Sequence, residues 1–88
     1  MEYSTAIRYC ICKKSYCLEI CVPIKHTLQI MDFVSGLDTD SDISTSAFNI
    51  RVYNDENILQ YIEYELGKFI SNIESAERCY SEIFMEKV

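Results

Sequence analysis

Residues 54–88 read NDENILQYIEYELGKFISNIESAERCYSEIFMEKV and carry the clearest structural pattern of the chain. Its apolar residues recur at alternating spacings of three and four, which places them along one side of an α-helix. The eight positions are Leu59, Ile62, Leu66, Phe69, Ile73, Ala76, Tyr80 and Ile83. We expect Asn54 or Asp55 to cap this helix, with Glu56 in the first turn, where the helix dipole favours an acidic side chain.

The stretch is predicted as one amphipathic helix, with a pair of helices as the alternative. One helix is favoured because the heptad phase is held without a break over the whole stretch. Two features favour a pair: Gly67 weakens a helix interior, and Ser71 with Glu74 has the spacing of a capping box that starts a new helix.

The N-terminal part of the chain is predicted as a β-hairpin. Residues 5–22 alternate in polarity on either side of a Lys-Lys pair and are rich in Ile, Tyr, Cys and Val. A two-residue Lys-Lys turn would place Ile7 opposite Ile20 and Cys10 opposite Cys17.

The middle of the chain is less clear. Residues 27–37 favour a short helix with Thr27 as its N-cap and Gly36 just beyond its end, although their alternation also fits a strand. Residues 38–46 are polar, and Phe48, Ile50 and Val52 then alternate as in a strand.

Together these elements predict a single domain over residues 1–88 of the α+β class. We expect a small antiparallel sheet of three or four strands, packed by the C-terminal amphipathic helix or helix pair.

Charge is unevenly distributed in the sequence. The net charge is −6, and residues 38–88 hold eleven acidic and four basic residues. This balance argues against direct binding of nucleic acid or of anionic membranes, and it favours a basic protein partner. The first residues lack a signal-peptide pattern and no apolar run is long enough for a membrane span, so we expect a cytoplasmic protein, in the host cytoplasm if it is viral.

Four of the five cysteines, Cys10, Cys12, Cys17 and Cys21, lie in the predicted hairpin, with His26 close behind. These residue types suggest zinc, but the hairpin would hold Cys12 and Cys21 roughly 20 Å apart, whereas ligands of one zinc lie within about 4 Å of each other. We therefore expect reduced thiols, no metal and no cofactor, with His26 exposed in a loop.

Asp38, Asp40 and Asp42 have the spacing that opens a calcium loop. Ile43 stands where that loop needs glycine and Asn49 where it needs glutamate, which argues against calcium. No catalytic motif is present, so we expect no enzyme activity.

The seven residues predicted to form a binding surface are Asp38, Asp40, Asp42, Tyr53, Tyr61, Tyr64 and Glu65. The last three lie off the apolar stripe, and interfaces are enriched in tyrosine. We interpret the chain as a non-enzymatic, acidic protein-binding module. It would act as a stoichiometric inhibitor of a basic, nucleic-acid-handling protein.

This interpretation rests on an analogy of charge and fold with anti-CRISPR-like phage inhibitors and with antitoxin or immunity proteins, since no motif identifies a family. One alternative is a structural module that self-associates, for example as a homodimer, through the heptad stripe or the cysteine-rich sheet face. Another is a thiol- or zinc-dependent regulator.

Overall fold

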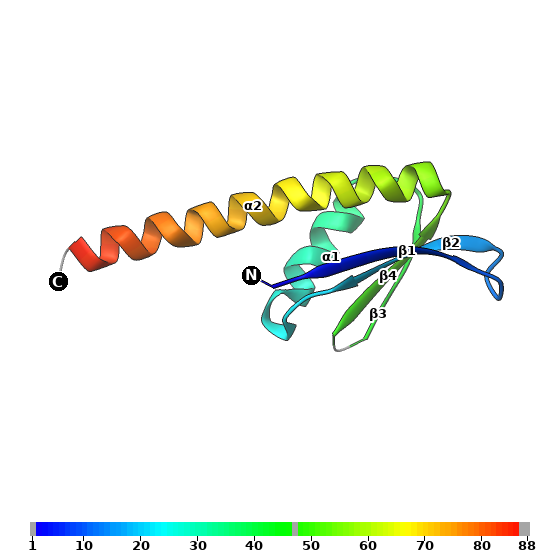
Figure 1. Ribbon diagram of the computed structural model, residues 1–88, viewed down its shortest axis with the longest axis horizontal. Helices are drawn as coiled ribbons and strands as arrows, with labels where there is room; N and C mark the ends of the chain where they lie inside the picture. Colours follow the sequence, from blue (N-terminus) through cyan, green and yellow to red (C-terminus); the bar gives the residue numbers. More distant parts are fainter. Residues whose placement is uncertain (1, 47, 87–88) are drawn as a thin grey trace.

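The computed structural model describes residues 2–46 and 48–86, and side chains as far as residue 76. It has the predicted α+β architecture (Figure 1). The elements are β1 (Ser4–Cys10), β2 (Ser15–Cys21), the 3-10 turn η1 (Ile24–His26), α1 (Thr27–Gly36), β3 (Asp42–Thr45), β4 (Asn49–Asn54) and α2 (Glu56–Glu86). In the described part of the chain no helix is both long and apolar enough to span a membrane.

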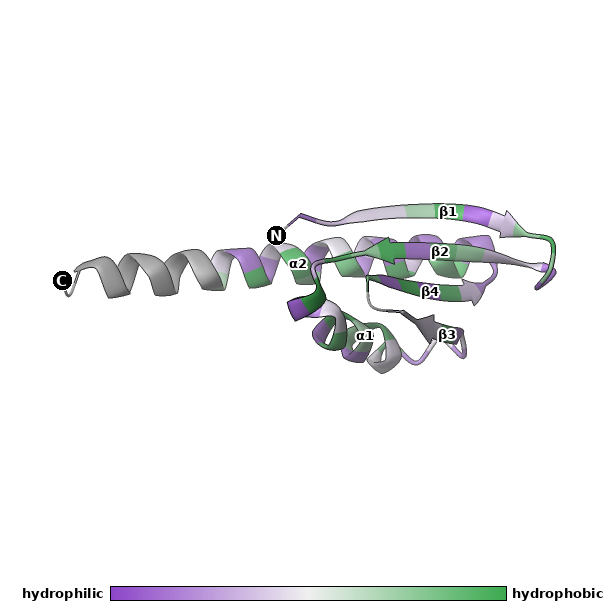
Figure 2. Ribbon diagram, turned by 90° about the horizontal axis from the view of Figure 1, so that it is seen from below, coloured by the Kyte–Doolittle hydropathy of each residue, from purple (hydrophilic) through white to green (hydrophobic). Residues whose placement is uncertain are grey.

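The four strands form one antiparallel sheet in the order β1-β2-β4-β3 (Figure 2). The two central strands supply most of the sheet's contribution to the core. Leu18 lies opposite Val52 and Ile20 lies opposite Ile50, and all four side chains are fully buried. Because side chains alternate across a sheet, these residues define an inner face, covered by the helices, and leave an outer face of the opposite parity.

The C-terminal stretch forms one helix, as favoured from the phase of its apolar residues. Leu59, Ile62 and Leu66 are fully buried as predicted, but the next fully packed residue is Ile70, not Phe69. A straight helix has 3.6 residues per turn, so a strict heptad stripe drifts around it and the buried position moves one residue onward.

Around Ile70 the side chains of α2 become less buried. Phe69 is half-buried and stacks on Phe33 of α1, with ring centroids 4.1 Å apart. Ile73 is half-buried and Ala76 is exposed. The side chains of the last two stripe positions, Tyr80 and Ile83, lie outside the described residues. Figure 1 shows the backbone of α2 running on past the sheet, and the molecule is 55 Å long.

The hairpin is present, but the predicted register is wrong. Ile7 lies opposite Leu18 and Cys10 opposite Ser15, because the turn contains four residues, Ile11 to Lys14, instead of two. Lys14 has a left-handed backbone, with φ of 51°, and its N–H donates to the carbonyl of Ile11 at 3.2 Å. The shift is by two positions, so each side chain keeps its predicted face.

The helix predicted over residues 27–37 is confirmed as α1, but both predicted ends are wrong. His26, not Thr27, is the N-cap residue, and it is buried in η1 instead of exposed in a loop. Its Nδ1 lies 3.5 Å from Oε1 of Gln29. Gly36 is helical, and the left-handed residue that redirects the chain is Asp38, with φ of 53°.

The polar residues 38–46 contain a strand that the sequence did not reveal. β3 is a short edge strand whose only half-buried side chain is Ile43, so its pattern carries little apolar signal. Phe48, expected to start the following strand, precedes β4 and is exposed.

Candidate functional site

The three predicted aspartates lie in and just after the connection from α1 to β3, and all are exposed. Asp38 and Asp40 have φ of 53° and 54°. Aspartate tolerates this left-handed conformation better than most residues, because its short polar side chain can interact with the local backbone. The two aspartates therefore shape the connection as well as carrying its charge.

Asn54, the last residue of β4, holds this connection in place. Its Nδ2 donates to the carbonyl of Thr39 at 3.0 Å and to Oγ of Ser41 at 2.7 Å. Its Oδ1 accepts the N–H of Asp55 at 2.7 Å. One amide side chain thus joins the aspartate-bearing connection to the start of α2.

The start of α2 adds two more acids to the same end of the molecule. The carbonyl of Asp55 accepts the N–H of Leu59 at 3.0 Å, which places Asp55 at the cap position, and Glu56 is in the first turn. We call the resulting group the acidic end; its members are Asp38, Asp40, Asp42, Asp55 and Glu56. It contains five of the fourteen acidic residues of the chain.

Tyr53 lies beside the acidic end, on the outer face of the sheet. It is opposite Asp42 in the β3–β4 pairing and is half-buried. The Nζ of Lys13, from the hairpin turn, lies 5.4 Å from the centroid of its ring. A partner that packs on Tyr53 would therefore also meet the Lys13 side chain.

The remaining predicted residues lie along α2, about one to three turns from its start. Tyr61 and Tyr64 are 49% and 66% exposed, whereas Glu65 is half-buried. Lys68 lies near both Tyr64 and Glu65. Its Nζ is 5.2 Å from the Tyr64 ring centroid and 3.5 Å from Oε1 of Glu65. The structure thus gathers the three aspartates with Tyr53 and leaves Tyr61, Tyr64 and Glu65 on the helix layer.

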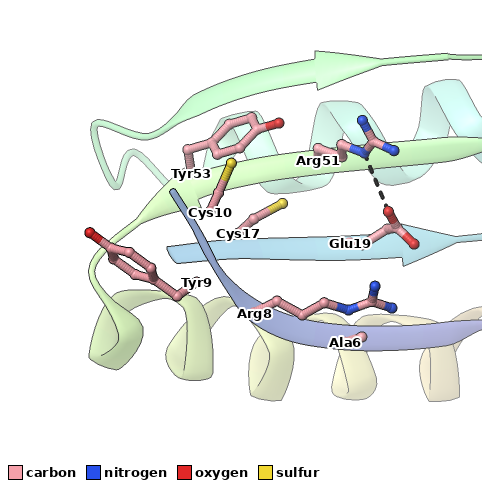
Figure 3. A pocket seen from close by; sticks show the side chains of 8 residues that line it. All are labelled: Ala6, Arg8, Tyr9, Cys10, Cys17, Glu19, Arg51 and Tyr53. Carbon is pink, nitrogen blue, oxygen red and sulfur yellow. Dashed lines mark hydrogen bonds and ion pairs between the residues drawn. The ribbon is translucent and has the colours of Figure 1, made fainter. Parts of the chain in front are cut away.

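The outer face of the sheet, which includes the cysteine-rich face considered above for self-association, holds a shallow hollow (Figure 3). Its volume is about 230 Å³. The residues that line it are Ala6, Arg8, Tyr9, Cys10, Cys17, Glu19, Arg51 and Tyr53. Their two-residue alternation was visible in the sequence, but their assembly depends on the pairing of β2 with β4, which the sequence does not specify.

Polar contacts and burial set the chemistry of this hollow. Arg51 Nε donates to Oε2 of Glu19 at 3.3 Å, and this hydrogen bond raises the pKa of Arg51. Burial raises the pKa of the Cys17 thiol, and the charge of Arg51 opposes the shift in part. Because the thiolate is the reactive form, this shift makes Cys17 less reactive than a fully exposed thiol.

Metal binding finds no support among the described side chains. They contain no group of three or more His, Cys, Asp or Glu residues positioned to hold a metal ion. The corrected register also removes the predicted facing pair of thiols, because Cys10 lies opposite Ser15 and Cys17 opposite Arg8.

No protein-family model, no curated protein and no solved structure matches the chain.

Proposed function

We propose that the protein is a non-enzymatic protein-binding module whose acidic end engages a positively charged surface of another protein. The main support is that the acidic side chains lie together on segments held by hydrogen bonds. Two segments that are distant in sequence, residues 38–42 and residues 55–56, supply its acids, and the hydrogen bonds of Asn54 join them. A fixed cluster of like charge can steer a basic partner and select its orientation.

The partner class follows from charge. A basic surface of the size needed to meet five acids is typical of proteins that handle nucleic acids, since these present clustered Lys and Arg to phosphates. An acidic module that occupies such a surface competes with the nucleic acid, which is how a stoichiometric inhibitor of anti-defence or antitoxin type would act. Tyr53 lies next to the cluster and offers an aromatic contact at its border.

Affinity capture with matched variants tests the proposal. Asp38→Asn with Asp40→Asn removes two charges and keeps a residue type that tolerates the left-handed backbone. Glu2→Gln with Asp32→Asn removes two charges from exposed positions outside the acidic end and is the control.

We expect the unaltered protein and the control to retain the same basic protein at low salt, and the Asp38/Asp40 variant to lose it. Equal retention by both variants would contradict the proposal. Circular dichroism of each variant verifies that the fold is unchanged.

A further inference from the structure

The two edges of the sheet differ in how well they are protected. β3 is four residues long and begins with a charged residue, Asp42. β1 is seven residues long and pairs with β2 at every position without a bulge. It contains no proline, lysine or acidic residue. Edge strands are normally shortened, charged or bulged to prevent pairing with another chain, and β1 shows none of these protections beyond a single Arg8.

The free edge of β1 faces no other strand of the described chain, and it is the outermost strand in Figure 2. A groove of about 580 Å³ lies beside it, between the start of β1 and α2. Tyr3, Tyr64, Gly67 and Ser71 are among its lining residues. A methyl group added at Gly67 would lie 3.7 Å from the hydroxyl of Tyr3, so the tyrosine lies over a point where the helix has no side chain.

The edge strand and this flank of α2 are held together. Thr5 Oγ1 donates to Oε2 of Glu63 at 2.7 Å, which ties β1 to the helix. The start of β1 and the groove therefore adjoin, and Tyr3 and Tyr64 there are 40% and 66% exposed; Tyr9, at the other end of β1, is 56% exposed.

We propose that this surface binds a second copy of the chain, with β1 pairing antiparallel to its own copy about a two-fold axis at Ala6. In that register Tyr9 lies opposite Tyr3 of the second copy, Ile7 opposite Thr5, and Arg8 opposite Ser4. The pairing joins aromatic with aromatic and places no like charges opposite each other, because Arg8 is the only charged residue of β1.

Area supports the inclusion of the helix flank. A stable interface buries about 1,600 Å² in total, more than one seven-residue strand edge supplies. Antiparallel pairing about Ala6 would place Tyr9 of the second copy beside Tyr3, at the groove that Tyr64 and Gly67 also line, so the helix flank would add to the interface. The result is an eight-stranded sheet whose two acidic ends point in opposite directions, which makes the dimer bivalent.

Sedimentation velocity over a concentration series tests this dimer with two matched variants. Tyr64→Lys alters the groove, whereas Tyr61→Lys makes the same change at an exposed tyrosine of α2 outside it. We expect a dimer for the unaltered protein and for Tyr61→Lys, and a dissociation constant at least about tenfold higher for Tyr64→Lys, because tyrosines are common hot spots.

Hydrogen exchange locates the contact independently of any variant. We expect the amides of β1 to become more protected as the protein concentration rises. A monomer at all concentrations would overturn the proposal, and it would leave the β1 edge to a strand of another protein. A dimer weakened by Tyr53→Lys but not by Tyr64→Lys would also overturn it, in favour of association through the outer face.

Discussion

At Gly36 the backbone is helical, although a glycine followed by an apolar residue usually marks a left-handed position after a helix. No atom outside its immediate neighbours would lie within 4 Å of a methyl group added there. Gly36→Ala should therefore stabilise the protein by about 0.5–1 kcal/mol, since alanine loses less conformational entropy in a helix. Urea denaturation measures this. A loss of stability would mean that the residue is left-handed after all.

Cys17 provides a second test at this scale, through pH. Burial raises the pKa of its thiol, so below the ordinary pKa of about 9 the thiol is neutral in both the folded and the unfolded state. Above that pH the unfolded thiol ionises first, which favours unfolding, and the stabilisation is lost as the pH rises through the folded-state pKa. We expect the urea midpoint of the unaltered protein to fall, relative to that of Cys17→Ala, as the pH rises above about 9. A difference that stays constant with pH would contradict the assigned burial.

Differential alkylation tests the same assignment by reactivity. Cys12 is exposed in the hairpin turn, whereas Cys17 is half-buried with a raised pKa. At pH 8 we expect iodoacetamide to modify Cys12 well before Cys17, as followed by mass spectrometry of the peptides. Equal rates at the two positions would contradict the described environment of Cys17.

At the scale of elements, the phase of α2 separates two neighbouring isoleucines. Ile70 is 2% exposed, whereas Ile73, a position of the predicted heptad stripe, is half-buried. Ile70→Ala should cost about 2–4 kcal/mol of stability, and Ile73→Ala less than about 1.5 kcal/mol, because a smaller cavity and less apolar contact are involved. Thermal and urea unfolding measure both. A larger loss at Ile73 would favour the heptad phase over the straight helix.

The connection between α1 and β3 depends on one side chain. Asn54→Ala removes two hydrogen bonds to the connection and one to the N–H of Asp55. We expect a loss of about 1–3 kcal/mol and faster amide exchange over residues 38–42. The control is Asn72→Ala, at an exposed position of α2, which should change stability little. Unchanged exchange in the connection would show that Asn54 does not hold it.

Over the whole molecule, the parts predicted from sequence are those governed by local periodicity. The helical spacing of Leu59, Ile62 and Leu66 predicted the long helix and its buried side. The alternation of residues 5–22 predicted the hairpin and the two faces of the sheet. The length of the hairpin turn could not be predicted, because lysine seldom adopts the left-handed backbone that Lys14 has. Strand β3 could not be predicted because it has little apolar content. The outer-face hollow required the strand order, which is set by long-range packing.

The residues predicted to form a binding surface divide in the same way. The sequence indicated that Tyr61 and Tyr64 are exposed, but it did not indicate which of the seven residues lie together. Asp42 and Tyr53 are eleven positions apart and become cross-strand neighbours only through the β3–β4 pairing. Tyr61 and Tyr64 are close in sequence, yet only Tyr64 lines the groove beside β1.

If the acidic end binds a basic protein surface, that binding depends on charge, and its salt dependence is the decisive measurement. Once the captured partner is purified, its dissociation constant is measured from low to high ionic strength for the unaltered protein, for Asp38→Asn with Asp40→Asn, and for the Glu2→Gln with Asp32→Asn control. We predict that binding of the unaltered protein and of the control weakens steeply as salt rises. The Asp38/Asp40 variant should bind more weakly at low salt and depend less on salt. Affinities that are independent of salt, or equal for the two variants, would show that the acidic end does not mediate the binding.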